Sequence, residues 1–327
     1  MASLDADDGI GAMSMKDLKA LIKSAGLGFA DCVEKSEMRT RAREAQARLA
    51  ASSVSSSSTT TPSTTSSSSS SSSFSSSSST SSTSKNLALS GYACIVSGPE
   101  ACLSGSEQPD LVILILHGLG ATNTNFTDLP QVASSLCSEK KVAWIFPQAD
   151  GHGWWELDVM KWMMAMQQGE AGLASLLREE PPGLQACRVR MKTLLAEARA
   201  LLGGVALSRF VLGGFSQGAM TAMDLALQLD GEEGGGATTK PAVAGVTMLS
   251  GAPIVVDQWA ERLPNHKGLK VFMSHGRADQ VLPFVASGWC RDLLQQGGAS
   301  VTYEPHGGGH ELGPSTFASL VAFWSSL

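Results

Sequence analysis

Hydrophobic residues make up 43% of this 327-residue chain, which is enough for a buried core, while charged residues make up 17% and the net charge is −6. This balance excludes a basic nucleic-acid-binding surface over the chain as a whole. The longest aliphatic run, Leu111–Leu116, is far shorter than the roughly 20 residues of a membrane helix. The acidic N-terminus has no secretory signal pattern and the six cysteines form no CxxC pair, so we expect a cytoplasmic protein without a zinc site or a disulfide framework.

The first 50 residues form a segment of their own, in which we predict two short helices. Ser14 can cap a helix over Met15–Ser24, and a second helix is expected over residues 34–50. The run MSMKDLKALIKSAGLGFADCVEKSEM resembles the SAP-like helical hairpin, a module that can bind nucleic acid, but we favour a small module that binds a protein. Nucleic acid is the less favoured partner, because acidic residues are interleaved with the basic ones.

Residues 51–85 consist almost entirely of Ser and Thr. Such a segment cannot bury enough apolar surface to offset the entropy of ordering it, so we predict a disordered linker. This linker separates the helical module, residues 1–50, from a body of residues 86–327. A body of this length is typical of one α/β domain.

Within the body, short aliphatic runs alternate with amphipathic segments. This pattern predicts an α/β fold whose mostly parallel sheet is covered by helices on both faces. The expected strands are Leu111–Leu116 and residues 142–146, 210–212, 243–249, 269–273 and 301–303, and the expected helices are residues 184–202, 219–229 and 317–324. The glycine-rich residues 231–239 are expected to form a surface loop. Active sites of such sheets lie beyond the carboxyl ends of the strands, where the candidate residues of this chain collect.

The most informative motif is Gly214-Phe215-Ser216-Gln217-Gly218, a G-x-S-x-G match. It follows an aliphatic strand and opens a helix, which is where a nucleophile elbow belongs. A turn this tight needs small neighbours, and Gly214 and Gly218 supply them. Ser216 would then stand at a helix N-terminus, whose N–H groups suit a developing oxyanion. The alternative is an ordinary Gly-Ser turn that caps a helix.

A serine hydroxyl is a poor nucleophile without a base, and in the α/β-hydrolase fold the partners follow in the order Ser, acid, His. Asp279 follows the predicted strand at 269–273, and His310 follows the last predicted strand. We therefore predict that His310 takes the proton of Ser216, while Asp279 orients the imidazole and stabilises its charged form.

Other residues compete for these roles. His306 also closely follows the last strand and is the rival base, whereas His275 is expected to be structural. Asp224 lies eight residues beyond the serine, inside the helix, so we expect a surface or helix-face carboxylate that points away from the elbow. Glu311 adjoins the predicted base but is expected to point elsewhere.

An oxyanion hole requires two N–H donors aimed at one oxygen. The first is expected to be the backbone N–H of Gln217, the residue after the nucleophile. The second is expected from the loop His117-Gly118-Leu119-Gly120, whose glycines allow a close approach to substrate, and we select the N–H of Leu119. His117 itself is expected to pin this loop by hydrogen bonds rather than to act as a base.

Five runs of the body together resemble one protein family. LHGLGA, GWWELD, LGGFSQGAM, SHGRADQVLPF and GGGHE occur in this order between about residues 110 and 312, and they resemble the phospholipase/carboxylesterase family of α/β hydrolases. That family includes acyl-protein thioesterases and many bacterial carboxylesterases. The resemblance implies an α/β-hydrolase fold, a triad at Ser216, Asp279 and His310, and oxyanion donors at Leu119 and Gln217.

Two of these runs are closer to the bacterial-type esterases than to the eukaryotic thioesterases. The bacterial-type pattern has HGxGA and GWW-LD, and this chain has Ala121 where the eukaryotic thioesterases usually have Asp. Hydrolysis of an ester or a thioester is the activity that both branches imply.

The segment 151–183 is rich in Trp and Met. We predict that it forms one wall of an acyl or aryl pocket beside Ser216, because Met adapts to irregular apolar chains. The alternative is a short helix whose side chains complete the core. The expected pocket residues are Trp154, Trp155, Leu157 and Met163, of which Trp155 and Leu157 match the family's substrate-side strip. Such a pocket favours uncharged acyl or aryl esters of short to medium chain.

These residues predict a serine hydrolase that cleaves carboxylic esters or thioesters through an acyl-enzyme, with no metal and no organic cofactor. The expected partner is a small acyl ester or thioester substrate, and no transmembrane segment is expected. Two alternatives remain open. One is a catalytically silent scaffold of the same fold that is used for binding, and the other is an acyltransferase with the same triad.

Overall fold

A computed structural model of the chain describes residues 10, 13, 15–25, 41–43, 45–46, 82–151, 153–229 and 240–327. The chain divides into two compact units, Met1–Ser77 and Ser78–Leu327. Residues 51–81 of the predicted linker, 51–85, and the predicted surface loop at 231–239 lie outside the described residues.

The N-terminal unit contains helix α1 (Met15–Ser24), whose bounds match the first predicted helix. Residues 41–43 and 45–46 are also helical and fall inside the second predicted helix, 34–50, the rest of which lies outside the described residues. A small apolar cluster joins these parts and consists of Ile10, Leu18, Ile22, Ala42 and Ala45. The protein-binding role of this unit stays a prediction.

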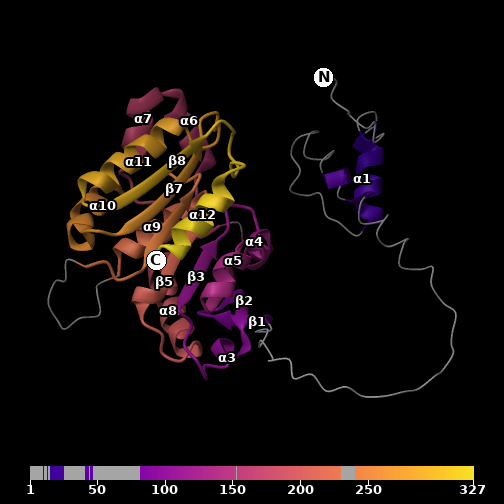
Figure 1. Cartoon of the computed structure of the whole chain (residues 1–327). Coiled ribbons are helices and arrows are strands. Elements are labelled where there is room, and N and C mark those ends of the chain that lie inside the picture. Colours follow the sequence, from indigo (N-terminus) through magenta and orange to yellow (C-terminus); the bar gives the residue numbers. More distant parts are fainter. Residues whose placement is uncertain are drawn as a thin grey trace, which may run out of the picture. The chain divides into compact units, whose positions relative to one another are not determined.

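The larger unit is built on one eight-stranded sheet with the strand order β1-β2-β4-β3-β5-β6-β7-β8 (Figure 1). The strands from β3 to β8 run parallel to their neighbours, and the β1–β2 hairpin adds to β4 in antiparallel fashion. This arrangement confirms the predicted α/β fold with a mostly parallel sheet. The strands are β1 (Ser82–Leu89), β2 (Tyr92–Pro99), β3 (Leu111–Leu116), β4 (Val142–Gln148), β5 (Phe210–Phe215), β6 (Gly245–Leu249), β7 (Lys270–Gly276) and β8 (Ser300–His306).

Helices cover both faces of this sheet, because its central strands are apolar on both sides. Side chains of α4 (Leu129–Val132), α5 (Ser134–Glu139) and α12 (Thr316–Ser325) share one core cluster. The opposite cluster takes side chains from α6 (Val159–Gln167), α7 (Gly169–Leu176), α8 (Leu184–Leu201), α9 (Gln217–Leu227), α10 (Val256–Arg262) and α11 (Phe284–Gln296). The remaining short helices of the described part are α3 (Glu100–Leu103), η2 (Asn123–Phe126), η3 (Leu207–Arg209) and η4 (Leu263–His266).

Four of the predicted strands extend further toward the carboxyl edge than their aliphatic runs, and β4 is the first of them, since it continues to Gln148. β5 continues to Phe215, β7 to Gly276 and β8 to His306. The added residues include Gly, Ser and His, which pair by backbone, as Gly276 does opposite His306. The strand ends therefore reach closer to the candidate catalytic residues than the hydrophobic pattern predicts.

The β1–β2 hairpin begins at Ser82, so the sheet starts four residues before the predicted body, which begins at residue 86. Residues 82–85 pair with β2 in antiparallel register, from Ser82 opposite Pro99 onward. Backbone groups make this pairing, so a Ser/Thr-rich run can join the sheet although its composition predicts a linker. The turn is Ser90-Gly91, and both residues have positive φ values of 50° and 75°.

Asp224 is a correction to the sequence analysis, because it is buried and is not a surface carboxylate. It accepts hydrogen bonds from Nε and Nη2 of Arg188, both at 2.7 Å, and from Nε1 of Trp259 at 3.0 Å. These partners come from α8 and α10, so the carboxylate ties α9 to two other helices. The helical pattern of α9 alone could not show this, since the counter-charge lies 36 residues earlier in the chain.

Candidate active site

The G-x-S-x-G motif forms a sharp turn between β5 and α9. Ser216 has φ 54° and ψ −121°, a strained conformation that costs a non-glycine residue roughly 1–3 kcal/mol. A Cβ on Gly214 would lie 2.4 Å from the carbonyl carbon of Gly218, and one on Gly218 would lie 2.2 Å from the carbonyl oxygen of Leu116. Backbone atoms cannot yield by that much, so both glycines are required by the packing of the turn.

Ser216 lies where the sheet meets a helix N-terminus. Its N–H donates to the carbonyl oxygen of Leu249 at 2.8 Å, which extends the pairing of β5 with β6 by one residue. The helix begins at the next residue, Gln217. The first N–H groups of a helix have no intrahelical acceptor and lie at the positive end of its dipole, so this position favours negative charge beside the serine.

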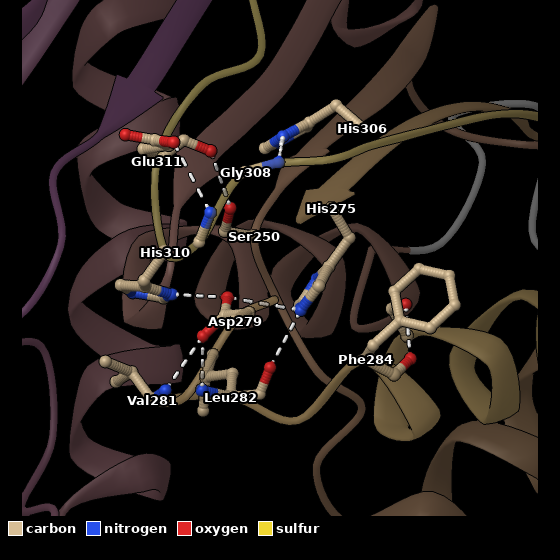
Figure 2. A network of polar contacts seen from close by, with 12 residues as sticks. Ser250, His275, Asp279, Val281, Leu282, Phe284, His306, Gly308, His310 and Glu311 are labelled. Carbon is tan, nitrogen blue, oxygen red and sulfur yellow. Dashed lines mark hydrogen bonds and ion pairs between the residues drawn. The ribbon is translucent and has the colours of Figure 1, made fainter. Parts of the chain in front are cut away.

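Asp279 and His310 meet beyond the ends of β7 and β8 (Figure 2). His310 Nδ1 lies 2.7 Å from Asp279 Oδ2, and the carboxylate is fully buried. The imidazole of His310 also packs against the ring of Phe215, with 4.9 Å between the ring centroids. Because Phe215 directly precedes Ser216, this contact brings the histidine to the nucleophile turn.

The carboxylate of Asp279 is held by four donors (Figure 2). Oδ1 accepts the N–H groups of Val281 at 2.9 Å and Leu282 at 2.8 Å, and Oδ2 faces His310 and, at 3.3 Å, Nε2 of His275. Burial raises the pKa of Asp279, but hydrogen bonds from His275, His310 and Leu282 outweigh burial and hold the pKa well below its usual range. The group is therefore an oriented carboxylate at neutral pH.

His275 is a buried side chain that supports the acid loop. Its Nε2 lies 2.8 Å from the carbonyl oxygen of Leu282, and because a carbonyl only accepts, this nitrogen carries the proton. The same N–H faces Oδ2 of Asp279. The expected structural role fits these contacts, although the sequence alone did not show that His275 touches the acid.

The rivals His306 and Glu311 are engaged elsewhere (Figure 2). His306 is buried, and its Nδ1 accepts the N–H of Gly308 at 3.1 Å. Glu311 accepts the N–H of Gly309 at 3.3 Å. Neither side chain lines the cavity that contains Ser216.

The loop after β3 approaches the nucleophile turn closely. A Cβ on Gly118 would lie 3.2 Å from Cδ1 of Phe215 and 3.4 Å from Cβ of Ser216. Leu119 follows in the same loop and lines one cavity with Ser216 and Gln217. The two residues predicted to supply the oxyanion N–H groups, Leu119 and Gln217, thus belong to two backbone segments that line the same cavity as the serine.

His117 anchors this loop, as expected from the sequence. Its Nδ1 donates to the carbonyl oxygen of Gly118 at 2.8 Å, and its Nε2 accepts the N–H of Ala149 at 3.1 Å. Burial lowers the pKa of His117, and the hydrogen bond to Gly118 only partly opposes this. The buried imidazole is therefore neutral, with both nitrogens already bonded.

A cavity of about 230 Å³ opens beside Ser216. Two of the predicted pocket residues, Trp155 and Leu157, line it, and the ring of Trp155 is oriented by an Nε1 hydrogen bond of 3.1 Å to the hydroxyl of Thr221. The full lining consists of Leu119, Trp155, Leu157, Val159, Trp162, Ser216, Gln217, Met220, Val281, Leu282 and His310. The lining contains no Lys, Arg, Asp or Glu, so it suits an uncharged acyl or aryl group.

Trp154 and Met163, the other two predicted pocket residues, lie outside this lining. Trp154 is buried, and its indole N–H donates to the carbonyl oxygen of His117 at 2.8 Å. This hydrogen bond therefore supports the loop after β3. Met163 is 46% exposed on α6, because its neighbour Trp162 occupies the inward position.

A second cavity of about 200 Å³ adjoins the first. The two share three lining residues, Trp155, Leu157 and Trp162. These side chains form a wall between the cavities. On the far side of this wall the lining includes Leu176 and several carboxylates, which are Glu156, Asp158, Glu179 and Glu180.

Five residues of the first cavity are not among the residues predicted for the site: Val159, Trp162, Met220, Val281 and Leu282. Met220 lies one helical turn after Ser216, and Val281 and Leu282 follow Asp279 by two and three residues. The sequence could have pointed to Met220, Val281 and Leu282, because each lies within four residues of a catalytic candidate. Val159 had no such signal, because its position depends on how α6 packs.

The arrangement supplies a hydroxyl on a strained turn and a histidine oriented by a carboxylate, and Leu119 and Gln217 line the same cavity as both. These are the parts that nucleophilic acyl transfer needs. In the described part of the chain, no three His, Cys, Asp or Glu side chains come together as a metal site. No helix among those residues combines the length and the apolar character needed to cross a bilayer.

Comparison with known proteins agrees with this geometry. Residues 98–326 match the family model described as Phospholipase/Carboxylesterase, which is well over half of the chain. The chain therefore belongs to the phospholipase/carboxylesterase family and is a carboxylic ester hydrolase with the α/β-hydrolase fold. The resemblance found in the sequence motifs is confirmed.

Curated relatives and solved structures extend this result. Acyl-protein thioesterase 1 of Neurospora crassa is 26% identical over 225 residues, which are 67% of this chain and 87% of the relative. The namesake from Yarrowia lipolytica is 27% identical over 194 residues, or 56% of this chain and 75% of the relative. The crystal structure of esterase PE8 has a TM-score of 0.53 at 20% identity and covers 69% of this chain and 95% of its own. A carboxylesterase from Mesorhizobium loti has a TM-score of 0.52 at 18% identity and covers 75% and 99%. At these identities the structures show the shared fold.

Proposed function

We propose that this hydrolase works through Ser216, His310 and Asp279 and forms an acyl-enzyme. His310 Nε2 takes the hydroxyl proton as Ser216 Oγ attacks the acyl carbonyl carbon, and the N–H groups of Leu119 and Gln217 stabilise the resulting oxyanion. The alcohol or thiol leaves with the proton from His310. Water, deprotonated by His310, then attacks the ester of Ser216, and the carboxylic acid is released as the serine recovers its proton.

One observation carries this proposal: Ser216 and His310 line the same cavity, and His310 is hydrogen-bonded to a buried, ionised Asp279. A histidine placed in this way is kept in the tautomer whose Nε2 can accept a proton. The strained backbone at Ser216 supports the same role, because such strain is typical of functional sites.

The proposed substrates are uncharged acyl or aryl esters and thioesters of short to medium chain. The cavity is lined by apolar side chains around the reacting groups, and Trp155 and Leu157 form part of its wall. The curated relatives are named acyl-protein thioesterases, which supports a thioester as one substrate. The cytoplasmic location expected from the sequence stays a prediction.

The experiment that tests the proposal is hydrolysis of p-nitrophenyl esters over a chain-length series, together with labelling by a fluorophosphonate. We expect turnover and labelling in the wild type and the loss of both in Ser216→Ala, with kcat lower by about 10⁴-fold or more. Ser175→Ala, at an exposed serine of α7, is the matched control and should behave as the wild type.

The same measurements test the alternatives. A wild type without turnover or labelling would favour the silent scaffold, and near-normal turnover in Ser216→Ala would exclude this serine as the nucleophile. Product analysis in the presence of an added alcohol distinguishes hydrolysis from acyl transfer, because transfer yields the new ester instead of the free acid.

A further inference from the structure

The turn that carries His310 closes around the imidazole of His306. Residues 306–313, HGGGHELG, lead from the end of β8 toward α12, and we call them the histidine turn. The side chain of His306 is buried, and two glycines of the turn lie against it. A Cβ on Gly313 would lie 2.7 Å from Cγ of His306, and one on Gly308 would lie 3.1 Å from Nδ1. The lack of a side chain at these two positions therefore lets the turn pack directly on the ring.

One hydrogen bond joins the turn to this ring. Nδ1 of His306 accepts the N–H of Gly308 at 3.1 Å (Figure 2). Because an acceptor nitrogen carries no proton, the proton of the neutral imidazole is on Nε2. Nε2 is buried and has no hydrogen-bond partner among the residues that the structure describes. A buried N–H without a partner destabilises a folded protein.

Core stability alone does not explain a histidine at this position. A leucine fills a similar space and leaves no buried N–H unpaired, so packing would favour the apolar residue. What a leucine cannot do is accept the N–H of Gly308. Gly308 lies two residues before His310, so this bond restricts the backbone that presents the imidazole of His310.

The histidine turn is also bonded to the loop that carries the acid. Ala278 donates its N–H to the carbonyl oxygen of Gly308 at 3.0 Å, and Arg277 donates its N–H to the carbonyl oxygen of His306 at 2.8 Å. Both donors immediately precede Asp279 in the chain. Gly308 is thus held by the ring of His306 at its N–H and by the acid loop at its carbonyl oxygen. A shift of Gly308 would therefore move the base relative to its acid.

We propose that His306 is a positioning residue, which holds His310 at the distance and angle needed for proton transfer from Ser216. This inference rests on the proposed function, because it takes His310 as the base. His306 does not line the cavity that contains Ser216, so it acts through the histidine turn and not on the reacting atoms. A displacement of about 1 Å in a reacting group costs up to about 100-fold in rate, so the loss of this bond should be measurable in kcat.

The first test compares two substitutions of His306 by the kinetics of p-nitrophenyl butyrate hydrolysis. His306→Asn keeps an acceptor, because the amide oxygen lies at a similar distance from Cβ as Nδ1, but it cannot take up the serine proton. His306→Leu keeps the bulk and removes the acceptor. We expect kcat within about threefold of the wild type for His306→Asn and about 10–100-fold lower for His306→Leu. KM should stay within about threefold in both variants, since neither substitution alters the cavity lining.

The second test leaves His306 in place and changes what packs on its ring. Gly313→Ala directs a Cβ against the imidazole, so the ring and its bond to Gly308 must shift, and kcat should fall by about tenfold. Gly307→Ala, in the same turn, meets open space and is the matched control. Urea unfolding of each variant establishes that the assayed protein is folded. If His306→Leu does not fold, His306→Asn and the two glycine variants still decide the question.

Three outcomes would overturn this proposal. The first is a folded His306→Leu variant with the kcat of the wild type, and the second is a fall in kcat of His306→Asn as deep as that of His306→Leu. The third is equal kcat in folded Gly313→Ala and Gly307→Ala. A loss of about 10⁴-fold in His306→Asn would identify His306 as the base itself. Failure of the proposed function is distinguishable, because it requires a wild type without turnover or an active Ser216→Ala.

Discussion

The strand ends that carry Ser216, Asp279 and His310 face the same cavity as α6, but side chains are held differently in the two regions. At the strand ends the polar groups are buried or half-buried and have directed partners, as the four donors around Asp279 illustrate. On α6 the outward side chains are exposed methionines, and one buried tryptophan, Trp162, secures the helix.

This difference corresponds to what each region has to do. Proton transfer requires donors and acceptors held within a few tenths of an ångström, which only packed elements with satisfied hydrogen bonds provide. Contact with acyl chains requires apolar area and tolerates several side-chain conformations, which methionine provides. The predictions that follow test whether the two regions can be changed separately.

The largest expected effect is on catalysis at the strand ends. In Asp279→Asn the amide cannot hold His310 in the tautomer that accepts the serine proton, so kcat should fall by about 10⁴-fold with a smaller change in KM. Steady-state kinetics with p-nitrophenyl butyrate measures this. Asp292→Asn, at a half-exposed aspartate of α11, is the control. A kcat within tenfold of the wild type would remove Asp279 as the triad acid.

Steric strain at the nucleophile turn should affect folding itself. Gly218→Ala places a Cβ 2.2 Å from the carbonyl oxygen of Leu116, where only backbone could yield, so we expect a loss of more than about 4 kcal/mol of unfolding free energy. Gly288→Ala on α11 meets open space and should stabilise the protein by about 0.5–1 kcal/mol. Urea unfolding followed by tryptophan fluorescence compares them, and equal stabilities would contradict the steric argument.

Two ion pairs contrast the buried and the exposed region. Arg188→Ala leaves Asp224 charged and buried without its partner, so unfolding free energy should fall by about 3–5 kcal/mol. Lys161→Ala on α6 breaks an exposed pair with Glu179 and should cost less than about 1 kcal/mol. The same urea titration gives both values. A cost for Lys161→Ala as large as that for Arg188→Ala would mean that α6 is held as firmly as the sheet.

A smaller effect is expected at the wall between the two cavities. Leu157→Ala should join them, so the chain-length optimum of p-nitrophenyl ester hydrolysis should move to longer chains, with about a tenfold gain in relative kcat/KM. Leu176→Ala enlarges only the second cavity and should leave the optimum unchanged. An unshifted optimum in Leu157→Ala would show that the wall does not limit chain length.

The smallest effect concerns acid stability. Because the pKa of Asp279 is depressed in the folded state, its ionised form stabilises the protein fully above about pH 4, and this contribution is lost as the pH falls below that value. The difference in unfolding free energy between the wild type and Asp279→Asn should therefore be constant from pH 7 to 5 and shrink below pH 4. A difference that grows in acid would reverse the assigned direction of the pKa shift.

Local motifs made much of the site predictable. The G-x-S-x-G run, the aspartate after β7 and the histidine after β8 are each recognised from a few neighbouring residues, and the parallel sheet brings its strand ends to one edge. Chain order alone therefore identified the residues that the structure groups around Asp279 and His310. The aliphatic runs of the central strands likewise determined the fold class.

Only the tertiary structure decided which side chains of the segment after β4 face the substrate. Trp154 is hydrogen-bonded to the loop at His117, Trp155 and Leu157 line the cavity, and Met163 is exposed. The tertiary structure also decided the surroundings of Asp224 and of the β1–β2 hairpin. Asp224 is buried against an arginine of another helix, and residues 82–85 pair with a neighbouring strand. Residue type determines which chemistry a side chain can perform. The direction in which the side chain points depends on the elements that pack against it, wherever the segment is irregular or apolar on more than one face.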